Sequence, residues 1–334
     1  MNGSIYNRLA LVACILTFIV VVLGAWVRLT DAGLGCPDWP GCYGHLSWPS
    51  TEQSIAVADQ VRADRAVDVG AAVREMVHRY AAGLLGLLVL ALAVMAWRRR
   101  RDPDQPVGLP LLLLGLIIFQ SALGAWTVTM LLKPAIVLAH LTGGLLTFSL
   151  LILLYLRTRP EKPRPNLPQR KLKTALGAAT VVLVVQILLG GWVSTNYAAL
   201  ACPDFPTCTG QWWPDSDFRE GFTLWRGVGV DYEGGILDQE GRVAIHMAHR
   251  IGAVAVIGVF AWLLMKLFST PGMTAPGLIL AALLATQIAL GILNVVWGLP
   301  LYIAVAHNGV AALLLACMVY LLHRTRLPRP SPSP

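Results

Sequence analysis

Eight segments of about 20 mainly apolar residues divide this chain, and each is long enough to cross the hydrocarbon core of a membrane as a helix. The chain has 334 residues, of which 56% are hydrophobic and only 13% are charged, so it carries more apolar surface than a soluble domain of this length buries. We therefore predict an all-α integral membrane protein. The predicted transmembrane helices are 8–28, 77–97, 109–130, 135–156, 173–193, 246–267, 277–297 and 302–322.

Basic residues distinguish the two sides of the membrane. Arg98 to Arg101 form a run after the second segment, and further lysines and arginines gather between residues 157 and 173 and after residue 323. Because basic residues concentrate in cytoplasmic loops, we predict a multi-pass protein of the cell (inner) membrane with both termini cytoplasmic. The long segments 29–76 and 194–245 are then external or periplasmic. The net charge of +8 follows from this orientation and does not indicate nucleic-acid binding, since the basic residues lie at helix ends.

The two halves of the chain repeat one another. Cys36 to Cys42 recurs as Cys202 to Cys208 at an offset of 166 positions, His78-Arg79 as His249-Arg250 at 171, and His140 as His307 at 167. Each repeat holds four apolar segments, and an even number gives both repeats the same orientation. We therefore predict eight transmembrane helices in two tandem four-helix bundles in parallel orientation, each with room for a cofactor between facing helices.

Domain boundaries follow from the duplication. The N-terminal four-helix repeat covers 1–156, a basic and proline-rich cytoplasmic linker covers 157–172, the C-terminal four-helix repeat covers 173–325, and a cytoplasmic tail covers 326–334.

Four histidines lie at matched positions inside apolar segments, His78 and His140 in the first half and His249 and His307 in the second. An ionisable side chain in hydrocarbon is costly and is a functional candidate by default. Paired histidines on facing helices indicate haem iron held by two imidazoles, with copper or a proton relay as alternatives. All four are expected in the first turns of their helices, near the external surface.

One difference between the repeats lies three residues before the first histidine. Glu75 precedes His78 on the same helix face, whereas His246 takes that place before His249. A carboxylate at one pocket only suggests different tasks for the two centres, because Glu75 could position water, move a proton or stabilise positive charge on a substrate. The alternative is a helix N-terminal acid favoured by the macrodipole. His246 is expected at the interface and is a weaker functional candidate.

Arginines and cysteines complete the set of candidate residues. Arg79 and Arg250 each follow a candidate ligand and are predicted to contact haem propionates, with snorkelling or a phospholipid contact as the alternative. The external pairs Cys36–Cys42 and Cys202–Cys208 are expected to form disulfides on the oxidising side of the membrane. A four-cysteine zinc site is the alternative.

Together these features resemble the haem A synthase family. The resemblance rests on the E-x-x-H-R motif from Glu75 to Arg79, the second His-Arg pair at residues 249 and 250, the later histidines and the external cysteine pairs, and it covers roughly residues 8 to 325. No single motif is specific, but their combination in a duplicated eight-span chain is.

The resemblance implies a function for each group. Family members oxidise a methyl group of haem O to a formyl group by successive hydroxylation, which gives haem A for cytochrome oxidase. By the same resemblance, His249 and His307 would ligate a haem b, and His78 and His140 would ligate the substrate haem O. Glu75 would be essential to the chemistry. Cys36 and Cys42 match the family's first-loop pair, whereas the second pair occurs in only part of the family.

The resemblance also implies several partners, and two alternative functions stay open. An electron donor is required, either a quinol or a ferredoxin-like protein, and contact with haem O synthase or with cytochrome oxidase assembly is expected from the order of the reactions alone. Homo-oligomerisation is left open. The alternatives to an enzyme are a bis-histidine di-haem electron-transfer protein that oxidises quinol and a haem transporter or delivery protein. Only the enzyme makes a formyl-bearing haem.

Overall fold

The computed structural model describes residues 2–61, 66–103, 105–159, 169–227 and 229–325. Most of the predicted linker 157–172 and the predicted tail 326–334 lie outside these residues. Eight of the described helices are long and apolar enough to cross a membrane, which confirms the predicted number of spans. In chain order the helices are α1 (Asn2–Leu29), α2 (Glu52–Val61), α3 (Val69–Arg98), α4 (Gly108–Thr129), α5 (Pro134–Thr158), α6 (Gln169–Thr195), α7 (Phe218–Gly221), α8 (Gln239–Phe268), α9 (Thr274–Val296) and α10 (Leu301–Arg324).

Two helices begin well before their predicted starts. Asp68 and Asp238 are the N-caps of α3 and α8, and their side chains accept hydrogen bonds from backbone N–H groups three residues further on. Charged residues in the first two turns of both helices interrupt the apolar run, so hydropathy alone places the starts too late. The prediction that His78 and His249 lie in the first turns is therefore wrong. Both lie about 14 Å along their helices, at 1.5 Å per residue.

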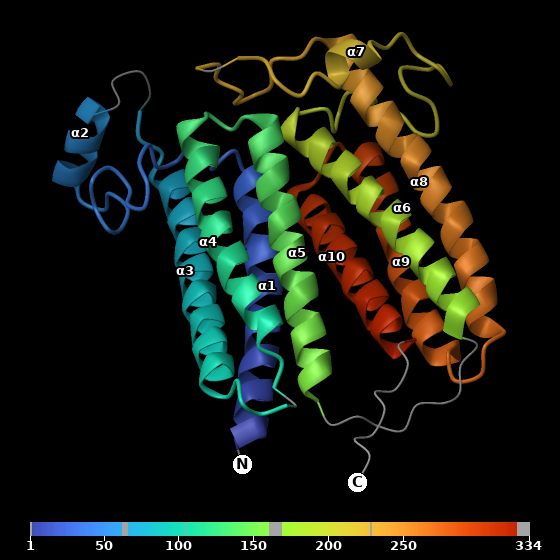
Figure 1. Cartoon of the computed structure of the whole chain (residues 1–334). Coiled ribbons are helices and arrows are strands. Elements are labelled where there is room, and N and C mark those ends of the chain that lie inside the picture. The colour runs from blue at the N-terminus through green and yellow to red at the C-terminus, as the bar shows by residue number, and fades with distance from the viewer. Residues whose placement is uncertain (1, 62–65, 104, 160–168, 228, 326–334) are drawn as a thin grey trace.

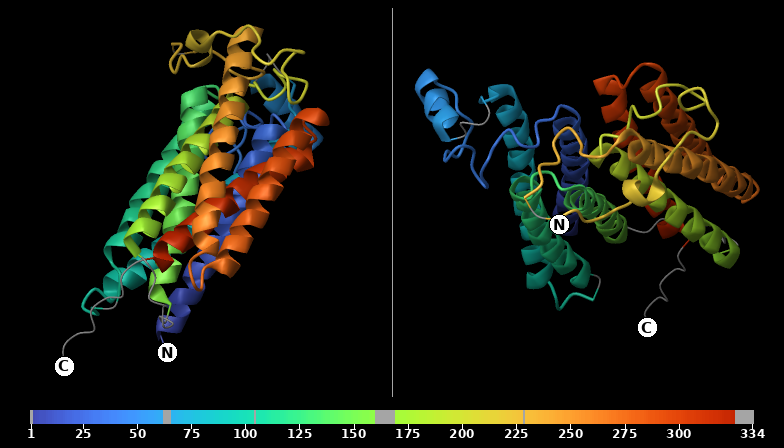
Figure 2. Two further views of the ribbon diagram at one scale, coloured as in Figure 1. Left: turned by 90° about the vertical axis from the view of Figure 1, so that its right-hand side faces the viewer. Right: turned by 90° about the horizontal axis from the view of Figure 1, so that it is seen from above.

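The long helices form two sets. In the first set, α1 and α4 each contact both α3 and α5; in the second set, α6 and α9 each contact both α8 and α10. Helix α10 also contacts α1 and α5, and α5 contacts α6, so these helices join the two sets. Figures 1 and 2 show the sets side by side, with the short α7 and its loop above their upper ends.

Repeat-equivalent residues touch one another where the sets meet. Arg28 at the end of α1 donates a hydrogen bond to the carbonyl oxygen of Ser194, and its guanidinium lies 4.0 Å from the centre of the Tyr197 ring. The Tyr197 hydroxyl donates in turn to the carboxylate of Asp31 at 3.0 Å. Both hydrogen bonds join residues 166 positions apart, which is the offset of the cysteine motifs. Contacts between equivalent residues occur at a two-fold axis, so these pairs mark such an axis approximately.

The long segment between α6 and α8 also packs on the first half. The backbone N–H of Tyr232 donates to the carbonyl oxygen of Leu131 at 3.1 Å, and the Tyr232 side chain is buried. The ammonium of Lys133 lies 3.1 Å from the centre of the Trp225 ring. These contacts attach the loop that precedes α8 to the turn between α4 and α5, above the first set of helices (Figure 1).

Candidate functional site

The histidines of each half lie on helices at opposite corners of their set. His78 is on α3 and His140 on α5, close enough to interact electrostatically, and the same holds for His249 on α8 and His307 on α10. The structure therefore brings together the two pairs that the sequence predicts. Because the helices that carry them are diagonal, each pair faces the middle of its set, where a bundle holds a cofactor.

Each imidazole packs against a glycine of a neighbouring helix. A Cβ at any of these glycines would lie 3.0 to 3.4 Å from Cε1 of the ring, so a larger residue would push the ring away. The pairs are Gly24 with His78, Gly124 with His140, Gly190 with His249, and Gly291 with His307. These glycines occupy repeat-matched positions, and this repetition is the sequence signal that could have identified them.

Three of the imidazoles have an unused nitrogen. Within the described part of the chain, Nδ1 of His78, of His140 and of His307 is buried and has no hydrogen-bond partner. Buried polar atoms are normally paired, and an exception calls for a missing ligand or water. A neutral imidazole has one nitrogen for a metal and one for a hydrogen bond, so buried rings that still have an unpaired nitrogen fit bis-histidine haem.

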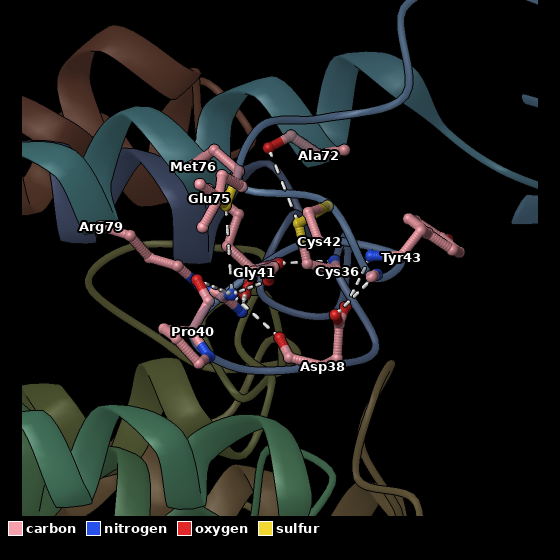
Figure 3. The surroundings of a disulfide bond; sticks show 12 residues. Cys36, Asp38, Pro40, Gly41, Cys42, Tyr43, Ala72, Glu75, Met76 and Arg79 are labelled. Carbon is pink, nitrogen blue, oxygen red and sulfur yellow. Dashed lines mark hydrogen bonds and ion pairs between the residues drawn. A yellow bond between two sulfur atoms is a disulfide. The ribbon is translucent and has the colours of Figure 1, made fainter. Parts of the chain in front are cut away.

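Glu75 lies beside the first disulfide-bonded loop, as Figure 3 shows. Its side chain is 5% exposed, and one carboxylate oxygen accepts a hydrogen bond from the backbone N–H of Cys36 at 2.8 Å. The other oxygen forms an ion pair with Arg79. No acidic residue is present in the first turn of α3, so Glu75 is not placed there to interact with the helix dipole.

Both predicted disulfides are present and pack on the helices that carry the first histidine of each half. Cys36 bonds to Cys42, and Cys202 bonds to Cys208. The first disulfide contacts Met76 of α3, and the second contacts Val243 of α8. Each pair is bonded within itself, which leaves no thiolate for the alternative zinc site.

The two arginines bind these loops. Arg79 donates to the carbonyl oxygens of Asp38 at 2.9 Å, of Pro40 at 3.3 Å and of Gly41 at 2.5 Å (Figure 3). Arg250 makes the equivalent contacts to the carbonyl oxygens of Cys202, Asp204, Pro206 and Thr207, at 2.7 to 3.4 Å. Each guanidinium therefore fastens a disulfide-bonded loop to its helix. The predicted propionate contacts would use the same donors and stay a prediction.

An aspartate in each disulfide-bonded loop accepts hydrogen bonds from backbone N–H groups at the end of the same loop. The carboxylate of Asp38 accepts from the backbone N–H groups of Tyr43 and Gly44, at 2.6 and 2.9 Å. Asp204 accepts in the same way from Thr209 and Gly210, at 2.5 and 3.0 Å. Hydrogen bonds from the Thr207 hydroxyl and from the Gly210 amide hold the pKa of the Asp204 carboxyl below its ordinary value.

His246 lies in the second half where Glu75 lies in the first. It is 6% exposed, and Nδ1 lies 2.9 Å from the carbonyl oxygen of Ala198. The expectation of an interfacial position is therefore wrong. The earlier start of α8 explains this, because His246 lies two turns inside the helix. No carboxylate occupies this position in the second half.

Replacing Arg250 by alanine is expected to destabilise the second disulfide-bonded loop by about 2 kcal/mol, because four carbonyl oxygens lose a charged donor. The measurement is the melting temperature of the purified protein in detergent, together with the rate of proteolysis in the loop. Arg242→Ala on the same helix removes only a weak contact of 3.4 Å and serves as the control. Equal melting temperatures for both variants would contradict this function of Arg250.

Known proteins are similar to this chain over most of its length. Residues 7–319 match the profile of a family described as cytochrome oxidase assembly protein, COX15-CtaA. The chain is 45% identical to a heme A synthase of Shewanella oneidensis over 309 residues, which cover 92% of this chain and 93% of the relative. This chain belongs to the haem A synthase family.

More distant members of the family match over similar lengths. The heme A synthase of Halalkalibacterium halodurans is 28% identical over 91% of each chain. The heme A synthase of Rhizorhabdus wittichii is 28% identical over 98% of this chain and 96% of the relative. The similarity therefore extends over all eight spans and both disulfide-bonded loops, not only over the E-x-x-H-R motif.

Proposed function

We propose that this chain is a haem A synthase, which oxidises a methyl group of haem O to a formyl group and so produces haem A. The observation that carries the proposal is the 45% identity to the Shewanella oneidensis heme A synthase over 92% of the chain. The pairs of histidines in the middle of each helix set supply the ligands that a porphyrin iron requires.

The helices form two tandem four-helix bundles in parallel orientation. Support comes from the two closed rings of helix contacts and from the hydrogen bonds between repeat-equivalent residues where the rings meet. Both termini are cytoplasmic and both disulfide-bonded loops are external. Disulfides in both loops support this, since such bonds persist on the oxidising side of a membrane.

The two bundles have different tasks. His78 and His140 hold the substrate haem O, and Glu75 lies three residues from one of them. His249 and His307 hold a haem b, which supplies electron transfer when bound. The asymmetry that supports this division is the buried carboxylate of Glu75, whose equivalent in the second half is His246.

Glu75 acts on protons and charge at the substrate site. Each hydroxylation of a methyl group requires proton transfers, and a buried carboxylate can donate or accept these protons or stabilise positive charge that develops on the substrate. The Cys36 N–H and the Arg79 guanidinium hold both carboxylate oxygens, so the group is fixed in place before the substrate arrives. Fixed groups lose no energy to reorganisation during the reaction.

The experiment that tests the function is expression of the chain in bacteria that make haem O but lack their own haem A synthase. We expect extracted haems to include haem A, identified by mass. A chain that accumulates in the membrane and carries bis-histidine haem, but yields no haem A, would instead be an electron-transfer or haem-delivery protein.

A further inference from the structure

The second-half histidine pair has a hydrogen-bond partner that the first half lacks. The side-chain amide nitrogen of Gln186 on α6 lies 3.1 Å from Nδ1 of His249 and 3.0 Å from the carbonyl oxygen of the same residue. The equivalent residue in the first half, 166 positions earlier, is Val20. Valine offers no polar side-chain atom, and only its backbone interacts with the ring of His78.

Gln186 fits its position because of a second difference between the repeats. Its amide oxygen lies against Gly252, where any Cβ would overlap it. Gly252 comes three residues after His249, and the equivalent residue after His78 is Ala81. The two residues are therefore compatible in size in each half. The second half pairs Gln186 with Gly252, and the first half pairs Val20 with Ala81.

The other glutamines near the histidines do not distinguish the halves. Gln287 lies 3.2 Å from Nε2 of His307, and Gln120 at the equivalent place donates to the carbonyl oxygen of His140 at 2.9 Å. Both halves thus have a glutamine beside the later histidine. Only the second half has one beside the earlier histidine.

A hydrogen-bond acceptor at Nδ1 orients an imidazole so that its Nε2 can bind iron. A neutral imidazole that ligates through Nε2 carries its proton on Nδ1, and an acceptor there fixes the tautomer and the ring orientation. The amide oxygen of Gln186 is buried without a partner, and turning the amide brings this acceptor to Nδ1 in exchange for the present hydrogen bond to the carbonyl oxygen of His249. Gln186 can therefore accept the Nδ1 proton once Nε2 binds a metal.

We propose that Gln186 is a positioning residue that holds His249 ready for iron and so makes the second-half site retain its haem, whereas the first-half site releases its product. This inference rests on the proposed function. A cofactor has to stay bound through many turnovers, while a substrate site must exchange. Outer partners of metal-binding histidines typically contribute about 10- to 100-fold in metal affinity, which is enough to separate a retaining site from an exchanging one.

The test compares two variants with the wild type. Gln186→Val combined with Gly252→Ala reproduces the first-half pair, and Gln186→Met keeps the length of the side chain without the amide. Haem b release is measured as the rate of transfer from the purified protein to excess apomyoglobin, and the midpoint potential of the bound haem is measured by redox titration. Thr180→Val is the control, because the Thr180 hydroxyl bonds only within α6, to the carbonyl oxygen of Leu176.

We expect both Gln186 variants to release haem b about tenfold faster or more, and their midpoint potential to rise, because the imidazole becomes a weaker donor. The Thr180 variant should match the wild type. Release rates and potentials equal to those of the wild type in both Gln186 variants would overturn the inference, even if the protein still makes haem A. A wild-type protein that binds no haem would overturn the proposed function as well.

Discussion

Replacing Glu75 by alanine is expected to abolish haem A formation while haem stays bound. The four histidines that we propose as ligands remain, but the buried carboxylate beside the proposed substrate site is lost. General acid–base groups typically contribute about 100- to 10,000-fold to a rate, so haem A should fall below detection in cells that depend on this chain. The measurement is the ratio of haem A to haem O in membrane extracts, alongside the haem spectrum of the purified variant.

Two further variants test whether the loss of haem A formation is specific to the charged carboxylate of Glu75. Glu75→Gln can still accept the hydrogen bond from Cys36 N–H but carries no charge, so it should be as inactive as the alanine variant if the charge or proton matters. Glu240→Ala removes an exposed acid from the first turn of α8 and should leave haem A formation unchanged. Normal haem A content in the Glu75→Ala variant would remove this residue from the mechanism.

Replacing either second-half histidine by alanine is expected to remove the resident b-type haem. His249 and His307 supply one imidazole each from opposite corners of their helix set, so one of them alone cannot give bis-histidine ligation. The reduced-minus-oxidised spectrum of the purified variants should lose the b-type bands. His78→Ala should keep those bands and should instead reduce the conversion of haem O to haem A.

A matched control for these variants is His45→Ala, since His45 is exposed in the first disulfide-bonded loop and lies outside the helix sets. Its spectrum and its activity should equal those of the wild type. An unchanged b-type spectrum in both the His249 and the His307 variants would show that the resident haem has other ligands. Loss of the same bands in His78→Ala would reverse the assignment of the two halves.

The sequence predicted the helix number and the paired histidines because both depend on strong local signals. A run of apolar residues that spans hydrocarbon has few alternatives to a helix, and a charged or ionisable group inside it is conspicuous. Assigning four helices to each repeat then paired His78 with His140 and His249 with His307, and the structure brings each pair together. The cysteine pairs were equally local, with partners only six positions apart.

Other features depend on contacts between distant segments, and the sequence did not reveal them. Arg79 binds carbonyl oxygens of a loop some 40 positions earlier, a contact that the sequence did not indicate. Every residue has the same backbone carbonyl group, so no sequence motif identifies the carbonyl oxygens that accept these hydrogen bonds. The starts of α3 and α8 could have been found from the capping residues Asp68 and Asp238, because an aspartate before a helix is a recognised start signal.

The glycines opposite the imidazoles show a further limit. Gly24 and Gly190 look like ordinary small residues in membrane helices, and such residues often serve only helix packing. Their effect on the rings appears only when neighbouring helices are placed, because the close approach joins α1 to α3 and α6 to α8. Gln186 is similar, since its partner His249 lies 63 positions away on another helix.

The most direct test of the account is extraction and mass analysis of the haems that copurify with the intact protein from cells that make haem O. We expect haem b at the second-half site, together with haem O or haem A from the first-half site. In the His249 and His307 variants we expect the loss of haem b alone. An undegraded protein that is colourless and free of iron, even after incubation with haem, would contradict the account.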